Sequence, residues 1–229
     1  MKIAEKVFEG IFLNRVTRFS AYVKIGKKKY LVFVPNPSPL SEILQKGKKV
    51  VVRKIEKSEG RKSSYDLIFV KDKNHLISID SRLPNKIFLE AVRNKQLKEF
   101  SHYFKIIPEY KFYESKFDFL LIGKDKCFVE TKSCSLVIDG VAKFPDAPTE
   151  RGRKHLKDLM LAKKKGFRAS LVFIIQRSDA RAFSPYDEVD AEFGKLLRKA
   201  VKEGVEVLAY VCKVQKRKIS LKKKVEVRL

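Results

Sequence analysis

Two acidic residues and a lysine interrupt apolar segments in the middle of this chain. The segments are residues 117–122 and 127–132, and they contain Asp118, Glu130 and Lys132. Burying an ionised carboxylate without a partner is so unfavourable that the group is normally neutralised or paired with a cation. Two carboxylates can hold Mg²⁺ or Mn²⁺, and a lysine close to them can orient or activate a water molecule. These residue types therefore predict metal-assisted hydrolysis of a phosphodiester.

We expect the two segments to form a β-hairpin. A three-residue loop at 123–125, in which Gly123 would accept a positive φ, places Asp118 opposite Glu130. Lys132 falls on the same face as Glu130 because strand side chains alternate. Two opposed carboxylates repel each other unless a cation lies between them. The alternative is a solvated hairpin edge on which all three side chains are exposed.

The first part of the chain, residues 1–82, is predicted to be mostly β. Its apolar residues alternate with a period of two and are broken by turns, which predicts strands at 7–16, 19–25, 29–34, 48–56 and 65–70, with a further strand at 76–79. Five short strands in this length favour a small barrel of the OB type, a fold that often binds oligonucleotides. An SH3-like barrel is the alternative.

The second part, residues 83–229, reads as helix, three strands, helix, strand, helix and strand. This order predicts an α/β domain with helices on both faces of a mixed sheet, so the whole chain is α+β. The first helix is expected at 86–100 and the second from near Asp146, as its N-cap, to Gly166. The basic segment 213–224 is expected to form an edge strand or hairpin.

The chain is strongly basic. It has 52 Lys and Arg against 27 Asp and Glu, a net charge of +25. Such a charge attracts polyanions, and we expect DNA as the partner, although a lysine-rich composition also accompanies adaptation to high temperature. No apolar stretch is long enough to span a bilayer, so we expect no membrane association. The cysteines Cys127, Cys134 and Cys212 form no metal motif, which predicts reduced core thiols and a cytoplasmic protein.

Two motifs give the chain a family resemblance. Residues 144–156, FPDAPTERGRKHL, resemble the FPDAxTxRGxxHL signature of the sugar fermentation stimulation protein family. Asp118 followed by Glu130, Thr131 and Lys132 resembles the D…ExK of that family, which is the core of the PD-(D/E)xK restriction-endonuclease-like fold. Further matches lie upstream and downstream, at Arg15, Arg18, Phe19, Pro35, Asn36, Gln176, Arg177, Phe183 and Pro185.

The resemblance implies a DNA-binding protein with an OB-like first domain (1–82) and a nuclease-like second domain (83–229). On this interpretation Asp118, Glu130 and the Thr131 carbonyl hold the Mg²⁺ or Mn²⁺, and Lys132 positions the attacking water. Glu90 is a further candidate ligand from the first helix, with a surface position as the alternative.

Other residues are expected to contact the phosphate or the nucleic acid. Arg151 and His155 share a helix face, so they can support the phosphate, or His155 can instead cap a neighbouring carbonyl. The candidate nucleic-acid contacts are Arg15, Arg18, Asn36, Arg151, Arg153, Lys154, Gln176 and Arg177. Stacking on Phe12, Phe19 or Tyr22 can accompany the arginines. For Phe12 and Phe19 we favour a place in the barrel core.

Two other functions remain open from the sequence. One is a non-catalytic DNA-binding regulator, linked to sugar metabolism, that retains a nuclease fold. The other is an accessory factor that binds RNA, which would prefer RNA over DNA of the same sequence. The sequence also leaves open whether the chain forms a homodimer or has a protein partner.

Overall fold

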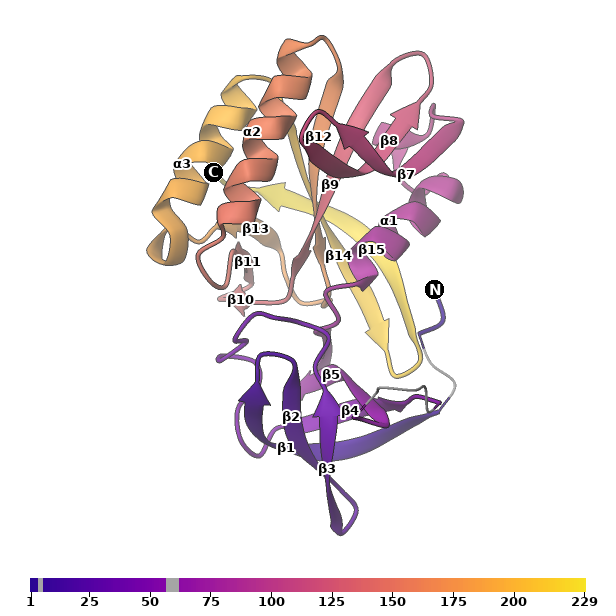
Figure 1. Cartoon of the computed structure of the whole chain (residues 1–229), viewed down its shortest axis with the longest axis vertical. Coiled ribbons are helices and arrows are strands. Elements are labelled where there is room, and N and C mark those ends of the chain that lie inside the picture. Colours follow the sequence, from indigo (N-terminus) through magenta and orange to yellow (C-terminus); the bar gives the residue numbers. More distant parts are fainter. Residues whose placement is uncertain (4–5, 57–61) are drawn as a thin grey trace.

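The structure is a computed structural model that describes residues 1–3, 6–56 and 62–229. A small barrel lies at one end of the molecule, and a larger sheet flanked by helices lies at the other (Figure 1). In the described part of the chain, no helix is both long enough and apolar enough to cross a membrane.

The barrel is built from the predicted strands. These are β1 (Val7–Thr17), β2 (Ser20–Ile25), β3 (Lys28–Phe33), β4 (Lys49–Lys54), β5 (Tyr65–Asp72) and β6 (His75–Ser78). They pair in the order β3-β2-β1-β4-β5-β6, and a parallel pairing of Phe33 with Asp66 joins β3 to β5 and closes the first five strands. Val23, Val32 and Val52 are fully buried inside, because alternation turns every second side chain inward. The predicted OB-type barrel is confirmed.

The larger domain contains a nine-stranded mixed sheet. Its order is β10-β11-β13-β15-β14-β12-β9-β8-β7, with parallel and antiparallel neighbours. The elements are α1 (Leu83–Arg93), β7 (Lys105–Phe112), β8 (Ser115–Ile122), β9 (Lys126–Cys134), β10 (Val137–Ile138), β11 (Val141–Phe144), α2 (Glu150–Lys164), β12 (Arg168–Ile175), β13 (Ala182–Pro185), α3 (Asp187–Lys202), β14 (Glu206–Gln215) and β15 (Lys218–Val227).

Helices cover both faces of this sheet, as predicted (Figure 1). On one face Phe88 of α1 packs against Phe119 of β8. On the other face α2 and α3 bury Leu159 and Phe193 in the cluster that contains Phe173. The central strand β12 supplies side chains to both clusters, which explains why its sequence is apolar without alternation.

The β8–β9 hairpin has the predicted register. Phe119 pairs with Val129 and Ile122 with Lys126, which leaves 123–125 as the loop. Gly123 does not have the expected positive φ. A Cβ at this position would lie 2.9 Å from the carbonyl oxygen of His102, so the glycine instead permits a close approach of two chain segments.

Two expectations about individual elements are wrong. The first helix ends at Arg93 rather than near residue 100, because Lys95 adopts a left-handed conformation with φ of 53°. The N-cap of α2 is Thr149, whose hydroxyl accepts a hydrogen bond from the Gly152 N–H at 3.0 Å, and not Asp146. The basic segment 213–224 forms the hairpin of β14 and β15, which confirms one of the two predicted alternatives, and β15 is not at an edge because β13, β11 and β10 continue the sheet beyond it.

Candidate functional site

A cavity of about 520 Å³ lies where the barrel meets the larger domain. The barrel contributes the loop 36–38, the junction contributes Arg82, and the larger domain contributes β8, β9 and the segment before α2. The polar residues that line the cavity are Asn36, Ser38, Ser81, Arg82, Asn85, Lys86, Asp118, Glu130, Thr131, Lys132, Ser133, Ser135, Lys143, Asp146, Thr149 and Arg151. The cavity thus contains both predicted acids and the predicted lysine.

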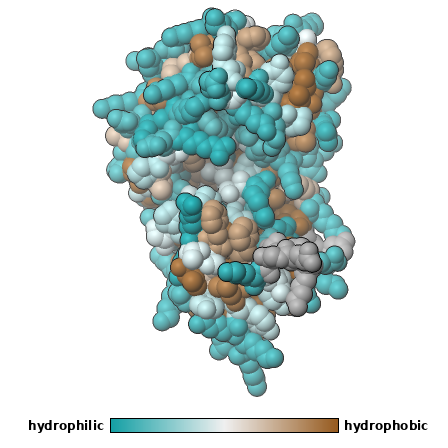
Figure 2. Space-filling view, in the orientation of Figure 1, coloured by the Kyte–Doolittle hydropathy of each residue, from teal (hydrophilic) through white to brown (hydrophobic). Residues whose placement is uncertain are grey.

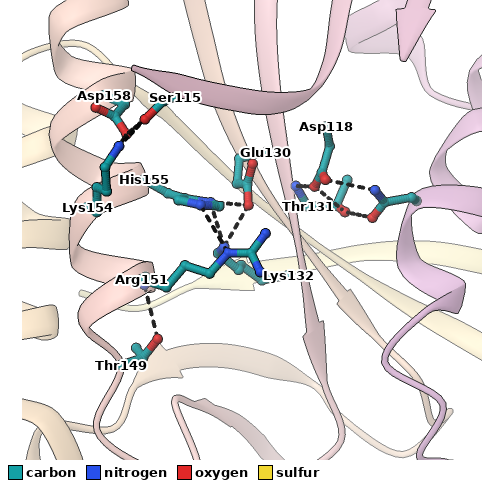
Figure 3. A network of polar contacts seen from close by, with 12 residues as sticks. Ser115, Asp118, Glu130, Thr131, Lys132, Thr149, Arg151, Lys154, His155 and Asp158 are labelled. Atoms are coloured by element: carbon teal, nitrogen blue, oxygen red, sulfur yellow. Dashed lines mark hydrogen bonds and ion pairs between the residues drawn. The ribbon is translucent and has the colours of Figure 1, made fainter. Parts of the chain in front are cut away.

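Glu130 is buried, and its two carboxylate oxygens have different surroundings. Oε1 lies 2.7 Å from Nζ of Lys132 and is also hydrogen-bonded to Nδ1 of His155. Oε2 is buried and has no hydrogen-bond partner among the described residues. Figure 3 shows Glu130, Lys132, His155 and Arg151 gathered between β9 and α2.

Asp118 is held by a second network, on the side of β9 that faces α1 (Figure 3). Its Oδ2 accepts a hydrogen bond from the Thr131 main-chain N–H at 2.8 Å, and its Oδ1 accepts one from Nδ2 of Asn85 at 2.7 Å. The Thr131 hydroxyl lies 2.9 Å from Asp118 Oδ2 and 2.6 Å from Asn85 Oδ1. The β8–β9 pairing ends at Phe119, so the Asp118 carboxylate replaces a main-chain partner for Thr131.

The two acids have opposite tendencies to ionise. Burial raises the pKa of Asp118, and the nearby charge of Glu130 raises it further, against the hydrogen bonds from Thr131 and Asn85. Burial also disfavours the charged form of Glu130. The hydrogen bond from His155 and the charges of Lys132 and His155 outweigh this effect and hold the pKa of Glu130 below its usual value.

The donor set fits a hard divalent cation. Glu130 Oε2 is an unpaired carboxylate oxygen, and Oδ1 of Asp118 retains acceptor capacity because it has two lone pairs and accepts one hydrogen bond, from Asn85. Carboxylate and main-chain carbonyl oxygens are the ligands that Mg²⁺ and Ca²⁺ prefer. Among the described residues no group of three or more His, Cys, Asp or Glu side chains is arranged to hold a metal. A cation here would therefore need the Thr131 carbonyl and water besides the two carboxylates.

Glu90 is not brought to this site. Its Oε2 lies 2.8 Å from the N-terminal ammonium of Met1, and its side chain is 40% exposed. It lies one to two turns along α1 from Asn85, the α1 side chain that does reach Asp118. The expectation that Glu90 supplies a metal ligand is therefore corrected.

Arg151 and His155 of α2 complete the group around Glu130. Arg151 is exposed and lines the cavity, and its Nε donates to Nε2 of His155 at 3.4 Å. His155 is buried and contacts the Glu130 carboxylate rather than a neighbouring carbonyl. The i, i+4 spacing thus places both side chains beside Glu130.

Comparisons with known proteins give a consistent result. The family model described as the sugar fermentation stimulation protein RE domain matches residues 82–218, and the one described as the SfsA N-terminal OB domain matches residues 13–79. A sugar fermentation stimulation protein homolog of Caldanaerobacter subterraneus subsp. tengcongensis is 49% identical over 228 residues, with 99% of each chain covered. The chain belongs to the sugar fermentation stimulation protein family.

Other relatives extend over the same length. A homolog from Clostridium perfringens is 43% identical, with 99% of each chain covered. The solved structure of Pyrococcus furiosus SfsA in complex with Ca²⁺ is similar with a TM-score of 0.92 and 30% identity, covering 100% of this chain and 98% of that one. The family assignment therefore holds for both domains.

The side chains of Arg15 and Asn36 form hydrogen bonds to main-chain groups in and around the loop at the cavity. The Arg15 guanidinium donates to the carbonyl oxygens of Thr17, Arg18, Asn36 and Pro39. Asn36 is buried, and its side chain donates to the Ile79 carbonyl at 3.0 Å and accepts from the Ser38 N–H at 2.9 Å. These contacts show that both residues stabilise the loop, and their role as direct nucleic-acid contacts stays a prediction.

Three more predicted contact residues have internal partners. Arg153 pairs with Asp190 at 2.8 Å. Buried Gln176 bonds to Ser78, the Asp80 carbonyl and Ser133, which joins the barrel to the sheet. Buried Arg177 pairs with Asp179 and the Ser135 carbonyl. Burial contradicts the expectation that Gln176 and Arg177 bind nucleic acid, whereas Arg153 is partly exposed and its role stays a prediction.

Arg18, Lys154 and Arg151 remain on the surface. Arg18 and Phe19 form the two-residue turn between β1 and β2, and Phe19 is 40% exposed. Phe12 is in the barrel core as predicted, but the core position favoured for Phe19 is wrong because a hairpin tip points outward. Lys154 is half-exposed and pairs with Asp158 in the next turn of α2.

Two features of the site were missed from the sequence. Asn85 forms hydrogen bonds with both Asp118 and Thr131. An amide in the first turn of a helix does not by itself indicate that it contacts residues of a strand. Asp66 and Asp80 are buried and share Arg53 and Arg82 at the domain junction. A signal existed for Asp66, because it is an acid within an apolar strand, like Asp118.

Proposed function

We propose that this protein binds DNA in the cytoplasm and that the cavity is the site of a phosphodiesterase, of nuclease type, that depends on Mg²⁺ or Mn²⁺. The observation that carries the proposal is the state of Glu130. One of its oxygens is buried without a partner in a cavity that also contains Asp118, while the other is fixed beside the Lys132 ammonium. A lone buried carboxylate oxygen is unfavourable unless a cation is bound to it.

The residues that would hold the ion are Asp118, Glu130 and the main-chain carbonyl of Thr131. Support comes from the relative from Pyrococcus furiosus, whose structure is of a complex with Ca²⁺. When bound, such an ion polarises a phosphoryl oxygen and lowers the pKa of a coordinated water.

The protein's own groups have separable tasks. Lys132 donates to Glu130 at 2.7 Å, and its Nζ lies 3.0 Å from Nδ1 of His155, so its ammonium has a fixed position from which it can orient a water molecule. Arg151 is exposed at the cavity, and its guanidinium can donate two N–H groups to a phosphate. His155 positions both cations because it contacts each of them.

Charge supports DNA as the substrate. The net charge of +25 favours association with a polyanion and its accumulation at the surface. Arg18, Arg151 and Lys154 are the predicted contacts whose side chains remain exposed. They supply phosphate contacts without sequence preference.

A non-catalytic DNA-binding regulator is the second candidate, and one observation favours it. Both oxygens of Asp118 already accept hydrogen bonds, and the burial of this acid raises its pKa, which disfavours the charged form that binds a cation. On that account the protein would retain the fold of a nuclease, and its cavity would not catalyse hydrolysis.

An assay for cleavage of supercoiled plasmid distinguishes the phosphodiesterase from the non-catalytic regulator. The full chain is incubated with Mg²⁺, with Mn²⁺ or with EDTA, and Lys132→Ala is compared with Lys116→Ala, which removes an exposed lysine of β8 paired with Glu109. We expect metal-dependent cleavage that Lys132→Ala lowers by about 100-fold or more and Lys116→Ala leaves intact. DNA binding without cleavage by the wild type under either metal would favour the regulator, and equal cleavage by both variants would place the chemistry elsewhere.

A further inference from the structure

The outer surface of the barrel carries a row of stacked aromatic and guanidinium groups. The rings of Phe19 and Phe33 are 6.2 Å apart and nearly parallel, at 12°. The Arg18 guanidinium lies 5.2 Å from the centroid of Phe19, and the Arg82 guanidinium lies 5.7 Å from that of Phe33. The row therefore consists of two neighbouring rings with a guanidinium at each end.

The same face of the barrel continues this row along β2 and β3. Ser20 pairs with Phe33, Tyr22 with Leu31 and Lys24 with Lys29, so all six side chains point to one face, outside the buried partners Ala21 and Val32. Lys29 Nζ lies 3.7 Å from the centroid of the Tyr22 ring. Figure 2 shows apolar surface on the barrel bordered by hydrophilic residues, in the region where Figure 1 places β2 and β3.

The row leads from the barrel into the cavity. Arg82 stands at its end, half-exposed, and is also one of the residues that line the cavity with Asp118 and Glu130. Arg82 uses Nε and Nη2 for its hydrogen bonds to Asp80 and Asp66, so these acids fix its guanidinium beside Phe33. Arg82 therefore belongs both to the row and to the lining of the cavity.

We infer that this row, formed by Arg18, Phe19, Tyr22, Lys29, Phe33 and Arg82, is a track for a single polynucleotide strand that enters the cavity. The inference rests on the proposed function and names its substrate class. Flat rings interleaved with cations suit unpaired bases and their phosphates, and the turn between the first two strands and the β2–β3 face are where OB folds hold oligonucleotides.

Two observations favour a single strand over a duplex. In a duplex the base faces are stacked on one another, so Phe19 and Tyr22 would have no base to stack on. The cavity, at about 520 Å³, has the size of a site for a small molecule, which admits a short segment of one strand and not a double helix.

The test uses the full chain with a fluorescein-labelled oligo(dT) in EDTA, so that binding is measured without cleavage. Phe19→Ala and Phe19→Leu should weaken binding by about tenfold, because both remove the aromatic face, and Phe19→Tyr should restore it. Phe8→Ala is the matched control, since Phe8 is 39% exposed on the same barrel but lies at the opposite end of β1. Thermal melting of each variant ensures that folded proteins are compared.

The outcomes distinguish the track from the nuclease site. Weakening confined to the Phe19 variants, together with tighter binding of the oligonucleotide than of a duplex of the same length, supports the track even if no metal supports cleavage. Binding of oligo(U) is measured in the same way, to test whether the sugar matters. If the Phe19 variants weaken that binding equally, the track also accepts RNA. Equal binding by Phe19→Ala and Phe8→Ala, or equal affinity for duplex and single strand, overturns the track and leaves the cleavage assay of Lys132→Ala unaffected.

Discussion

At the scale of single residues, the site depends on how each carboxylate oxygen is satisfied. Asp118 is held by an amide and a strand N–H, whereas Glu130 is held by an ammonium and an imidazole on one oxygen only. This asymmetry leaves Glu130 Oε2 as the atom with unsatisfied capacity. A buried atom of this kind normally has a partner, and the proposed cation would supply one.

Asn85→Ala tests the support of Asp118. The change removes the donor at 2.7 Å from Oδ1 and the acceptor at 2.6 Å from the Thr131 hydroxyl. We expect the free energy of unfolding, from urea titration, to fall by about 1–3 kcal/mol, because buried polar groups lose their partners. Asn94→Ala is the control, because Asn94 is an exposed residue just after α1. An equal effect of the two variants would contradict a specific role for Asn85.

The sequence predicts some contacts of single residues and not others, and the difference has a physical reason. The loop length predicted the register of the hairpin from Phe119 to Val129, because strand pairing is local. The pairing ends there, so Asp118 bonds to Thr131 on the side of α1 and does not lie opposite Glu130 as expected. The partners of Arg15 and Asn36 were not predictable, since they bond to carbonyls as far away in sequence as Pro39 and Ile79. The exposure of Phe19 was missed because the first strand extends to Thr17, so the turn of the first hairpin begins one residue later than the alternation indicates and includes Phe19.

At the scale of elements, Asp190 ties the start of α2 to that of α3. Its main chain is non-helical, with φ of −147°, and its Oδ1 accepts from the Phe193 N–H at 3.0 Å, so it caps the following part of α3. Its Oδ2 accepts from the N–H of Thr149, the N-cap of α2, and Arg153 donates to both oxygens. The helix that carries Arg151 and His155 is thereby fixed.

The stability contributed by Asp190 should depend on pH. Burial raises its pKa, but the N–H groups of Thr149 and Phe193 and the Arg153 guanidinium outweigh burial, so the pKa in the folded protein is lowered. A lowered pKa gives stability that is present above the pKa of the unfolded chain, about 3.9, and is lost as the pH falls through the folded value.

Asp190→Asn should therefore lower the free energy of unfolding by about 3 kcal/mol at pH 7, with a smaller difference from the wild type below about pH 4. Asp187→Asn is the control, because Asp187 pairs with Arg198 on the surface of the same helix, at 43% exposure, and should cost less than about 1 kcal/mol. A difference for Asp190→Asn that stays constant from pH 7 to pH 3 would contradict this account.

At the scale of the whole molecule, the cavity exists only because the two domains are held together. Gln176, at the end of β12, contacts Ser78 and Asp80 of the barrel segment and Ser133 of β9, and a main-chain bond from the Ser78 N–H to the Gln176 carbonyl adds to them. A buried amide needs hydrogen-bond partners. That the partners lie in the other domain follows from tertiary packing, which the sequence pattern does not encode.

Gln176→Ala should uncouple the domains. We expect a loss of about 2–4 kcal/mol, because the change leaves buried groups on both sides without partners. Scanning calorimetry should then resolve the barrel and the larger domain as separate transitions. Gln215→Ala, an exposed glutamine at the end of β14, should leave the melting profile unchanged. Identical profiles for the two variants would show that other contacts hold the junction.

The central claim, that the carboxylates of Asp118 and Glu130 bind a divalent cation, is tested most directly by crystals of the full chain soaked in Mn²⁺. An anomalous difference map locates the ion independently of any activity. We predict a peak in the cavity between Glu130 Oε2 and Asp118, within about 2.0–2.3 Å of both carboxylates. A map at saturating Mn²⁺ with no peak beside Glu130 Oε2 would contradict the claim and leave DNA binding as the function of the molecule.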